Sequence, residues 1–221
     1  MLKELKNCLP YRAWHELLKQ NKMAVRDEKL LWMVPRSSGK AVLFAFLDIC
    51  VETGTGVKMP PFVLIRGHAV VIIPILKEKE SGECHVILVK QLRAAGGGFL
   101  YELPAGMLDE EIHDPAKVAV REFDEEVGLP LGDTVLHPIN TEPLYTSPGL
   151  LDEGIFYFYF EKELCRSEIR KWNNKINSNP HENEHIEVLI IPFEQAFDKI
   201  RSIPALYGLA WYQIHKMGGF P

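Results

Sequence analysis

The sequence predicts an α/β fold of the α+β kind, in which helices pack on a mixed β-sheet and a β-rich extension precedes that sheet. Three observations lead to this prediction. Runs of β-branched and aromatic residues recur along the chain, helical patterns are few, and one helical pattern has clear start and stop signals. The 221 residues are enough for one large domain with a small extension.

The first 60 residues form the predicted N-terminal extension. Two apolar stretches, "MAVRDEKLLWMV" (23–34) and "KAVLFAFLDICVE" (40–52), are predicted strands, and the serines and Gly39 between them are typical of a hairpin turn. The segment "GTGVKMPP" (54–61) is expected to be a linker, because its glycines and prolines resist regular structure. Residues 61–221 then form the main domain.

Five strands and two closing helices are predicted in the main domain. The strand ranges are 67–76, 84–92, 99–106, 154–164 and 184–192, and the first of them is an unbroken apolar run typical of a buried strand. The two helices are "FEQAFDKIR" (193–201) and "PALYGLAWYQIHK" (204–216).

Composition argues against several classes of function. A net charge of −5 without a basic stripe argues against nucleic-acid binding, and no apolar run reaches the roughly 18 residues of a membrane helix. The cysteines are far apart and form no CxxC pair, so free thiols are expected rather than a zinc or redox site. The N-terminus lacks the apolar core of a signal peptide, so the cytosol is the expected compartment, with an organelle as the alternative.

A third helix is predicted over residues 115–127. Asp114 is a good N-cap, Pro115 suits the first helical position, and Gly128 suits the left-handed position after the end. At about 100° per residue, one stripe forms the predicted core face. Its members are Ala116, Ala119, Val120, Phe123 and Val127.

The neighbouring face of this helix is acidic. Glu122, Glu125 and Glu126 have the spacing i, i+3 and i+4, and Arg121 lies four residues before Glu125. Clustered like charges repel one another unless a cation lies among them, and carboxylates are suitable ligands for Mg²⁺. Charge patterning alone also allows a solvated acidic face.

The stretch "REFDEEVGL" (121–129) resembles the signature of the Nudix hydrolase family, and it matches at the seven positions that the family fixes. The loop between Gly106 and Arg121 departs from the family pattern by one inserted residue. Outside the signature, "YELPAGMLD" (101–109), "YTSPGLLDE" (145–153) and "ENEHIEV" (182–188) resemble the subgroup that cleaves ADP-ribose and ADP-sugars, including plant ADP-sugar diphosphatases. The resemblance implies an α/β/α sandwich on a mixed sheet, with residues 61–221 as the Nudix domain.

The resemblance also implies an activity. It is Mg²⁺-dependent hydrolysis, with Mn²⁺ as an alternative metal, of a nucleoside diphosphate sugar such as ADP-ribose or ADP-glucose. The products are a nucleoside monophosphate and a sugar phosphate. The implied metal ligands are the Ala105 carbonyl and the side chains of Glu122, Glu126 and Glu184, and the implied catalytic residues are the general base Glu182, Glu125 and the orienting Arg121.

Substrate contacts are also implied by the resemblance. Arg93 would contact the phosphates or the terminal sugar, with a surface ion pair as the alternative, and Phe44 would stack on the base across a homodimer. Glu153 is a weaker candidate for the base, and the acidic loop around Glu182 has a plain polar loop as its alternative. Alternative functions are hydrolysis of UDP-glucose or GDP-mannose, and recognition of a nucleotide sugar without cleavage.

Overall fold

The computed structural model describes residues 2–35, 42–108, 114–179 and 184–219. The chain divides into two compact units. The N-terminal unit contains Met1–Ala69, Met107–His113 and Pro143–Ile155, and the C-terminal unit contains Val70–Gly106, Asp114–Glu142 and Phe156–Pro221.

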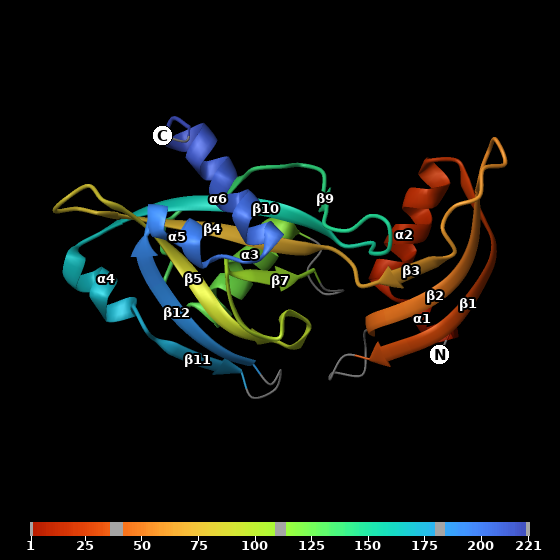
Figure 1. The fold of residues 1–221 in the computed structure, drawn as a ribbon, viewed down its shortest axis with the longest axis horizontal. Helices are drawn as coiled ribbons and strands as arrows, with labels where there is room; N and C mark the ends of the chain where they lie inside the picture. Colours follow the sequence, from red (N-terminus) through yellow and green to blue (C-terminus); the bar gives the residue numbers. More distant parts are fainter. Residues whose placement is uncertain (1, 36–41, 109–113, 180–183, 220–221) are drawn as a thin grey trace. The chain divides into compact units, whose positions relative to one another are not determined.

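The N-terminal unit is built on a three-stranded antiparallel sheet in the order β1-β2-β3 (Figure 1). Its strands are β1 (Met23–Pro35), β2 (Val42–Thr53) and β3 (Phe62–Ile65), preceded by helices α1 (Leu2–Leu5) and α2 (Leu9–Gln20). The two long strands were predicted, whereas α1, α2 and β3 were not. Helix α1 and strand β3 have four residues each, and Pro10 near the start of the twelve-residue α2 is the local signal that could have indicated a helix.

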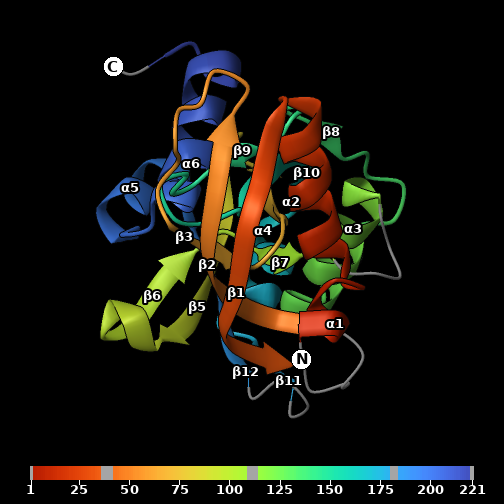
Figure 2. The same ribbon diagram turned by 90° about the vertical axis from the view of Figure 1, so that its right-hand side faces the viewer.

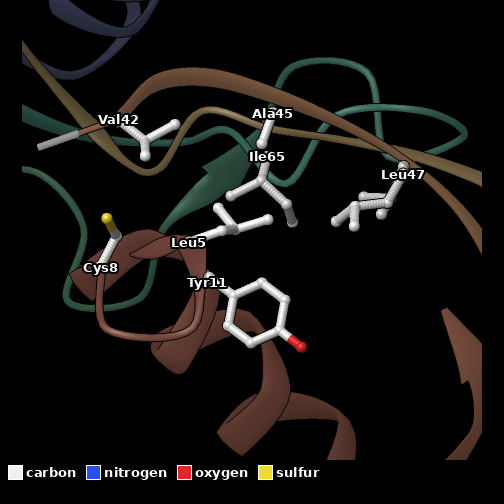
Figure 3. Close-up of a cluster of buried hydrophobic side chains, with 8 residues drawn as sticks. Leu5, Cys8, Tyr11, Val42, Ala45, Leu47 and Ile65 are labelled. Atoms are coloured by element: carbon white, nitrogen blue, oxygen red, sulfur yellow. The ribbon is translucent and has the colours of Figure 1, made fainter. Parts of the chain in front are cut away.

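A small core of its own holds the N-terminal unit together. Leu5, Tyr11, Ala45, Leu47 and Ile65 are almost completely buried and come from α1, α2, β2 and β3 (Figure 3). Complete burial of a leucine or isoleucine side chain stabilises the folded unit by roughly 1.5–3 kcal/mol. The predicted linker folds back on β2, since the Met59 N–H donates to the Val51 carbonyl at 2.9 Å.

The second sheet has nine strands among the described residues, in the order β11-β12-β5-β4-β10-β8, with β6 on β5, β7 on β4 and β9 on β10. Strand β5, for example, pairs in antiparallel orientation with β4, β6 and β12. The strands are β4 (Ala69–Glu78), β5 (Cys84–Arg93), β6 (Gly98–Glu102), β7 (Ala105–Met107), β8 (His137–Pro138), β9 (Leu144–Tyr145), β10 (Gly154–Leu164), β11 (Ile176–Asn179) and β12 (Glu184–Pro192). The helices are α3 (Pro115–Glu126), α4 (Arg166–Trp172), α5 (Ala196–Lys199) and α6 (Ile203–Lys216).

Adjacent residues of β10 show how the C-terminal unit is layered. Successive side chains of a strand point to opposite faces of the sheet. Phe160 packs edge-on against Phe123 of α3, whereas Tyr159 contacts Trp211 and Tyr212 of α6. Helices therefore cover both faces, with α3 on one and α5 and α6 on the other (Figure 2). This confirms the predicted α/β/α sandwich, and the separate three-stranded sheet confirms the β-rich N-terminal extension.

Most of the predicted elements of the main domain are present. β10 and β12 have the predicted bounds, and the predicted strand 99–106 is split into β6 and β7. Pro104 lies at the split, and its carbonyl accepts from the Ile72 N–H at 2.9 Å. Most of the predicted helix 193–201 forms, as a 3₁₀ turn (Phe193–Gln195) followed by α5. Within the described ranges no helix is both long and apolar enough to cross a membrane.

Candidate active site

Helix α3 begins and ends at the predicted signals. The Asp114 side chain accepts from the Ala116 N–H at 3.0 Å, Pro115 is the first helical residue, and Gly128 has a φ of 66° after the end. The predicted core face is wrong at Val120, which is 44% exposed. The buried stripe instead includes Val118 and Glu126, because the helix turns its acidic face toward the sheet.

The Glu126 carboxylate is buried and held at both oxygens. The Gln91 side-chain amide donates to Oε1 at 2.6 Å, and the Ala105 N–H donates to Oε2 at 3.0 Å. Only 4% of Glu126 and 5% of Gln91 are exposed. A buried carboxylate requires such donors, because removing it from water without them is highly unfavourable.

Glu122 lies one helical turn before Glu126 and contacts the next residue of β7. A Cβ added to Gly106 would overlap the Glu122 carboxylate, so the glycine leaves the space that this carboxylate occupies. Arg121 Nη2 donates to Glu122 Oε1 at 2.6 Å, and Arg121 Nε lies 4.0 Å from Glu125 Oε1. Arg121 thus lies between both acids, with its shorter contact to Glu122 and a longer one to the half-exposed Glu125.

These contacts bring Ala105, Glu122 and Glu126 together. Successive residues of β7 lie against acids on successive turns of α3, Ala105 against Glu126 and Gly106 against Glu122. Carboxylate and carbonyl oxygens are the ligands that Mg²⁺ prefers. The donor set therefore fits a divalent metal ion, and the missing side chain of Gly106 leaves room for one of its carboxylates.

A polar contact at the end of α3 was not predicted. Asn177 of β11 donates from Nδ2 to the backbone carbonyl of Glu126 at 2.7 Å, and so satisfies one of the carbonyls that a helix end leaves unpaired. β11 pairs with β12 up to the Asn179 and Glu184 pair, on either side of the loop that contains Glu182. Glu182 lies outside the described residues, and Glu184 is described only through its backbone.

Arg93 ends β5 and forms an ion pair with Glu102 of β6. Its Nε and Nη2 both donate to Glu102 Oε2, at 2.9 and 2.8 Å. The side chain is half-exposed, and guanidinium carries further donors beyond those that Glu102 uses.

Phe44, the predicted base-binding residue, belongs to β2 of the N-terminal unit. The Arg66 guanidinium lies over its ring, 5.7 Å from the centroid, and donates to Glu153 at 2.8 Å. Glu153 also accepts from the Thr146 hydroxyl at 2.9 Å. Arg66 was not singled out from the sequence, although it directly precedes the predicted strand 67–76.

The segment around Pro148 is tied to the N-terminal sheet through Asp152. This carboxylate accepts from the backbone N–H groups of Arg66 at 2.7 Å and of Gly67 at 3.1 Å. Burial is the main cause that raises the pKa of Asp152 to about 6, against the opposing effect of these donors. His68 accepts from the Gly154 N–H through Nδ1, and burial lowers its pKa, so it is a neutral, structural residue at pH 7.

A second group of metal-binding residue types lies at the hairpin between β4 and β5. Among the residues that the structure describes, the ligand atoms of Glu78, Glu83 and His85 lie within 4.8 Å of one another. Arg166 donates twice to Glu78, at 2.6 and 2.9 Å, and lowers the pKa of that carboxyl. The Arg166 guanidinium therefore already supplies, at these carboxylates, the positive charge that a metal ion would bring.

Comparisons with known proteins agree with the geometry. The family model described as "NUDIX domain" matches residues 66–210. Nudix hydrolase 14, chloroplastic, of Arabidopsis thaliana is 32% identical over 75% of this chain and 55% of its own length, so the chain spans about half of that relative. An ADP-ribose pyrophosphatase of Bacillus subtilis is 27% identical over 80% of the chain and 84% of its own length. A GDP-mannose pyrophosphatase of an Enterobacter species is 30% identical over 70% of the chain and 75% of its own length.

The fold has been seen in solved structures. A crystal structure described as an ADP compounds hydrolase superposes with a TM-score of 0.57 at 17% identity, over 88% of this chain and 96% of that one. Likeness at this identity concerns the fold alone. The family match extends over more than half of the chain and includes the acidic helix, β5 and β7. The chain therefore belongs to the Nudix family.

Proposed function

We propose that the protein hydrolyses the pyrophosphate bond of a nucleoside diphosphate sugar, ADP-ribose or ADP-glucose, with Mg²⁺ as the cofactor and Mn²⁺ as an alternative. The products are a nucleoside monophosphate and a sugar phosphate. The observation that carries the proposal is the convergence of Glu122, Glu126 and Ala105 where α3 meets β7. A protein that only binds a nucleotide sugar gains nothing from crowding these acids together.

Glu122, Glu126 and the Ala105 carbonyl would hold the metal, joined by Glu184 when substrate is bound. Divalent cations held there supply charge that neutralises the diphosphate and favours deprotonation of the attacking water. Glu182 is the proposed general base that takes the proton of this water. Arg121 orients Glu122 and Glu125 through the contacts already described.

Arg93 and Phe44 are the proposed substrate contacts. The guanidinium of Arg93 has donors left for a phosphate oxygen or the terminal sugar after its ion pair with Glu102. The Phe44 ring with Arg66 over it provides an aromatic face and a cation, which suit stacking against a purine. Relatives named ADP-ribose pyrophosphatase and ADP-sugar pyrophosphatase support an adenine base.

GDP-mannose is the second candidate substrate, because several relatives are named GDP-mannose pyrophosphatase at 29–31% identity. UDP-glucose remains a further alternative. We propose a homodimer, supported by the exposed Leu31 and Trp32 on the edge strand β1. The cytosol is the proposed compartment, and the relative named chloroplastic makes a plastid the alternative.

The test is release of phosphomonoester from a panel of ADP-ribose, ADP-glucose, UDP-glucose, GDP-mannose and NADH. Each substrate is run with Mg²⁺, with chelator, and with the variant Glu126→Gln. Cleavage of one or two substrates is expected, abolished by chelator and reduced in the variant by more than the roughly 10–100-fold typical of residues that only support a ligand. Light scattering of the same preparation gives the number of subunits.

Asp124→Asn is the matched control, because Asp124 lies on the exposed side of the same helix. It removes one charge from α3 and should retain the activity of the parent protein. A folded protein that binds one of these compounds but cleaves none would refute the hydrolase and favour a binding module.

A further inference from the structure

Gln91 is a buried polar residue at a position where its strand faces the core. Alternate residues of β5 point the same way, and Ile87 and Val89 on that face are completely buried. A buried amide is unfavourable unless it is hydrogen-bonded. The position is therefore occupied by a polar side chain for a specific partner, and that partner is Glu126.

The bond from Gln91 determines the orientation of the Glu126 carboxylate. Gln91 Nε2 is 2.6 Å from Oε1, and the Ala105 N–H is 3.0 Å from Oε2. A carboxylate oxygen has more than one lone pair, so a donor on it does not by itself exclude a metal ion. With these donors on both oxygens, the carboxylate cannot rotate without breaking a bond in a buried site.

The neutrality of the donor matters as much as its position. A lysine or arginine at position 91 would compensate the charge of Glu126 and would compete with a metal ion for it. An amide orients the carboxylate and leaves its negative charge in place. The strand itself is well supported, since Gln91 pairs with Leu100 of β6 and its neighbour Lys90 pairs with Glu187 of β12.

We propose that Gln91 is a positioning residue, which holds the Glu126 carboxylate ready for the metal ion and thereby sets metal affinity. This inference rests on the proposed function for its biological meaning, since Glu126 is a metal ligand only in that proposal. In this proposal Gln91 acts through Glu126 and is not itself a metal ligand.

The test compares Gln91→Met with the parent protein. Methionine has a similar length and no donor. Mn²⁺ binding to the free protein is measured by electron paramagnetic resonance, without substrate. The Mn²⁺ dissociation constant should rise roughly 10–100-fold, the usual effect of losing a group that supports a metal ligand. With substrate, activity should return as the metal concentration rises, while KM at saturating metal stays near that of the parent.

Val89→Ala is the control for a general loss of packing, because Val89 is buried on the same face of β5. It should keep the parent Mn²⁺ affinity. Gln91→Asn is a second variant, in case Gln91→Met does not fold. It keeps a polar amide but is one methylene shorter, so it cannot span the distance and should show the same loss.

Two outcomes would overturn the inference. One is a Mn²⁺ affinity of Gln91→Met or Gln91→Asn within twofold of the parent. The other is an equal loss in Val89→Ala. A protein that loses Mn²⁺ affinity in both Gln91 variants but hydrolyses none of the panel would uphold the role of Gln91 and refute the hydrolase, so the two failures are distinguishable.

Discussion

Gly106 is the residue in β7 whose missing side chain makes room for a carboxylate. Its φ lies outside the left-handed region, so backbone conformation does not require a glycine here. A glycine is required because there is no room for a side chain: a Cβ at this position would overlap the carboxylate of Glu122. The obstructing group is the end of a flexible side chain, which can move where a backbone could not. The consequence of filling this space should therefore fall on the acid rather than on the fold.

Gly106→Ala is expected to lower kcat/KM and metal affinity by roughly 10–100-fold, since a displaced carboxylate no longer supports the metal. The free energy of unfolding should change far less. Steady-state kinetics, Mn²⁺ titration and urea unfolding of one preparation measure all three quantities.

Gly98→Ala is the control, because a Cβ at Gly98 meets no atom within 4 Å. It should leave kinetics and metal affinity unchanged. If Gly106→Ala keeps the activity and metal affinity of the parent, Glu122 does not need this space.

The bounds of helix α3 were predicted to within one residue, and its signals are local. Asp114, Pro115 and Gly128 act on the backbone within a few residues of themselves, so a single sequence is enough to read them. Its buried face was predicted less well. Hydrophobicity alone assigned Val120 to the core, whereas the helix turns Glu126 inward, and that rotation depends on β5 and β7.

Asp114→Ala should lower the free energy of unfolding by about 1 kcal/mol, because the Ala116 N–H loses its acceptor. Asp114→Ser should recover most of that loss, since serine also caps helices. Urea unfolding at constant pH measures both variants. An Asp114→Ala protein as stable as the parent would mean that the hydrogen bond seen at this cap contributes nothing net.

Elements and contacts that depend on distant residues were harder to predict. β3 has only four residues and is recognisable as a strand mainly because it pairs with β2. Gln91 and Asn177 both act on Glu126, 35 and 51 positions away in sequence, and no local pattern reports such contacts. One signal was present: a polar residue on the apolar face of the strand "CHVILVKQL". The boundary at residue 60 and the roles of Glu182 and Glu184 stay predictions.

Across the whole molecule, the N-terminal unit is assembled from segments far apart in the chain. Residues 143–155 return to β3, where the Leu64 N–H donates to the Leu150 carbonyl at 2.8 Å. Asp152 completes this contact by accepting from the Arg66 and Gly67 N–H groups across 86 and 85 positions of sequence. The Pro148 segment is therefore held by backbone hydrogen bonds to β3 and by the Asp152 carboxylate.

The ionisation of Asp152 should make this contact sensitive to pH. Its pKa rises from 3.8 to about 6 in the folded protein, mainly through burial, with Glu153 adding to the rise. Between these values the folded state binds more protons than the unfolded state. Stability from this group is therefore present below about pH 4 and is lost as pH rises to about 6, by at most roughly 3 kcal/mol.

Asp152→Asn should remove this dependence. Asparagine keeps an oxygen that accepts from the Arg66 and Gly67 N–H groups and carries no charge at any pH. Relative to the parent, the variant should therefore gain stability from pH 4 to pH 6 and hold that gain above pH 7. Urea unfolding of both proteins at half-unit steps of pH measures the difference, with Asp124→Asn as a control for losing one surface charge. A difference that stays constant across this range would mean that Asp152 does not retain its proton in the folded protein, and that its backbone donors outweigh its burial.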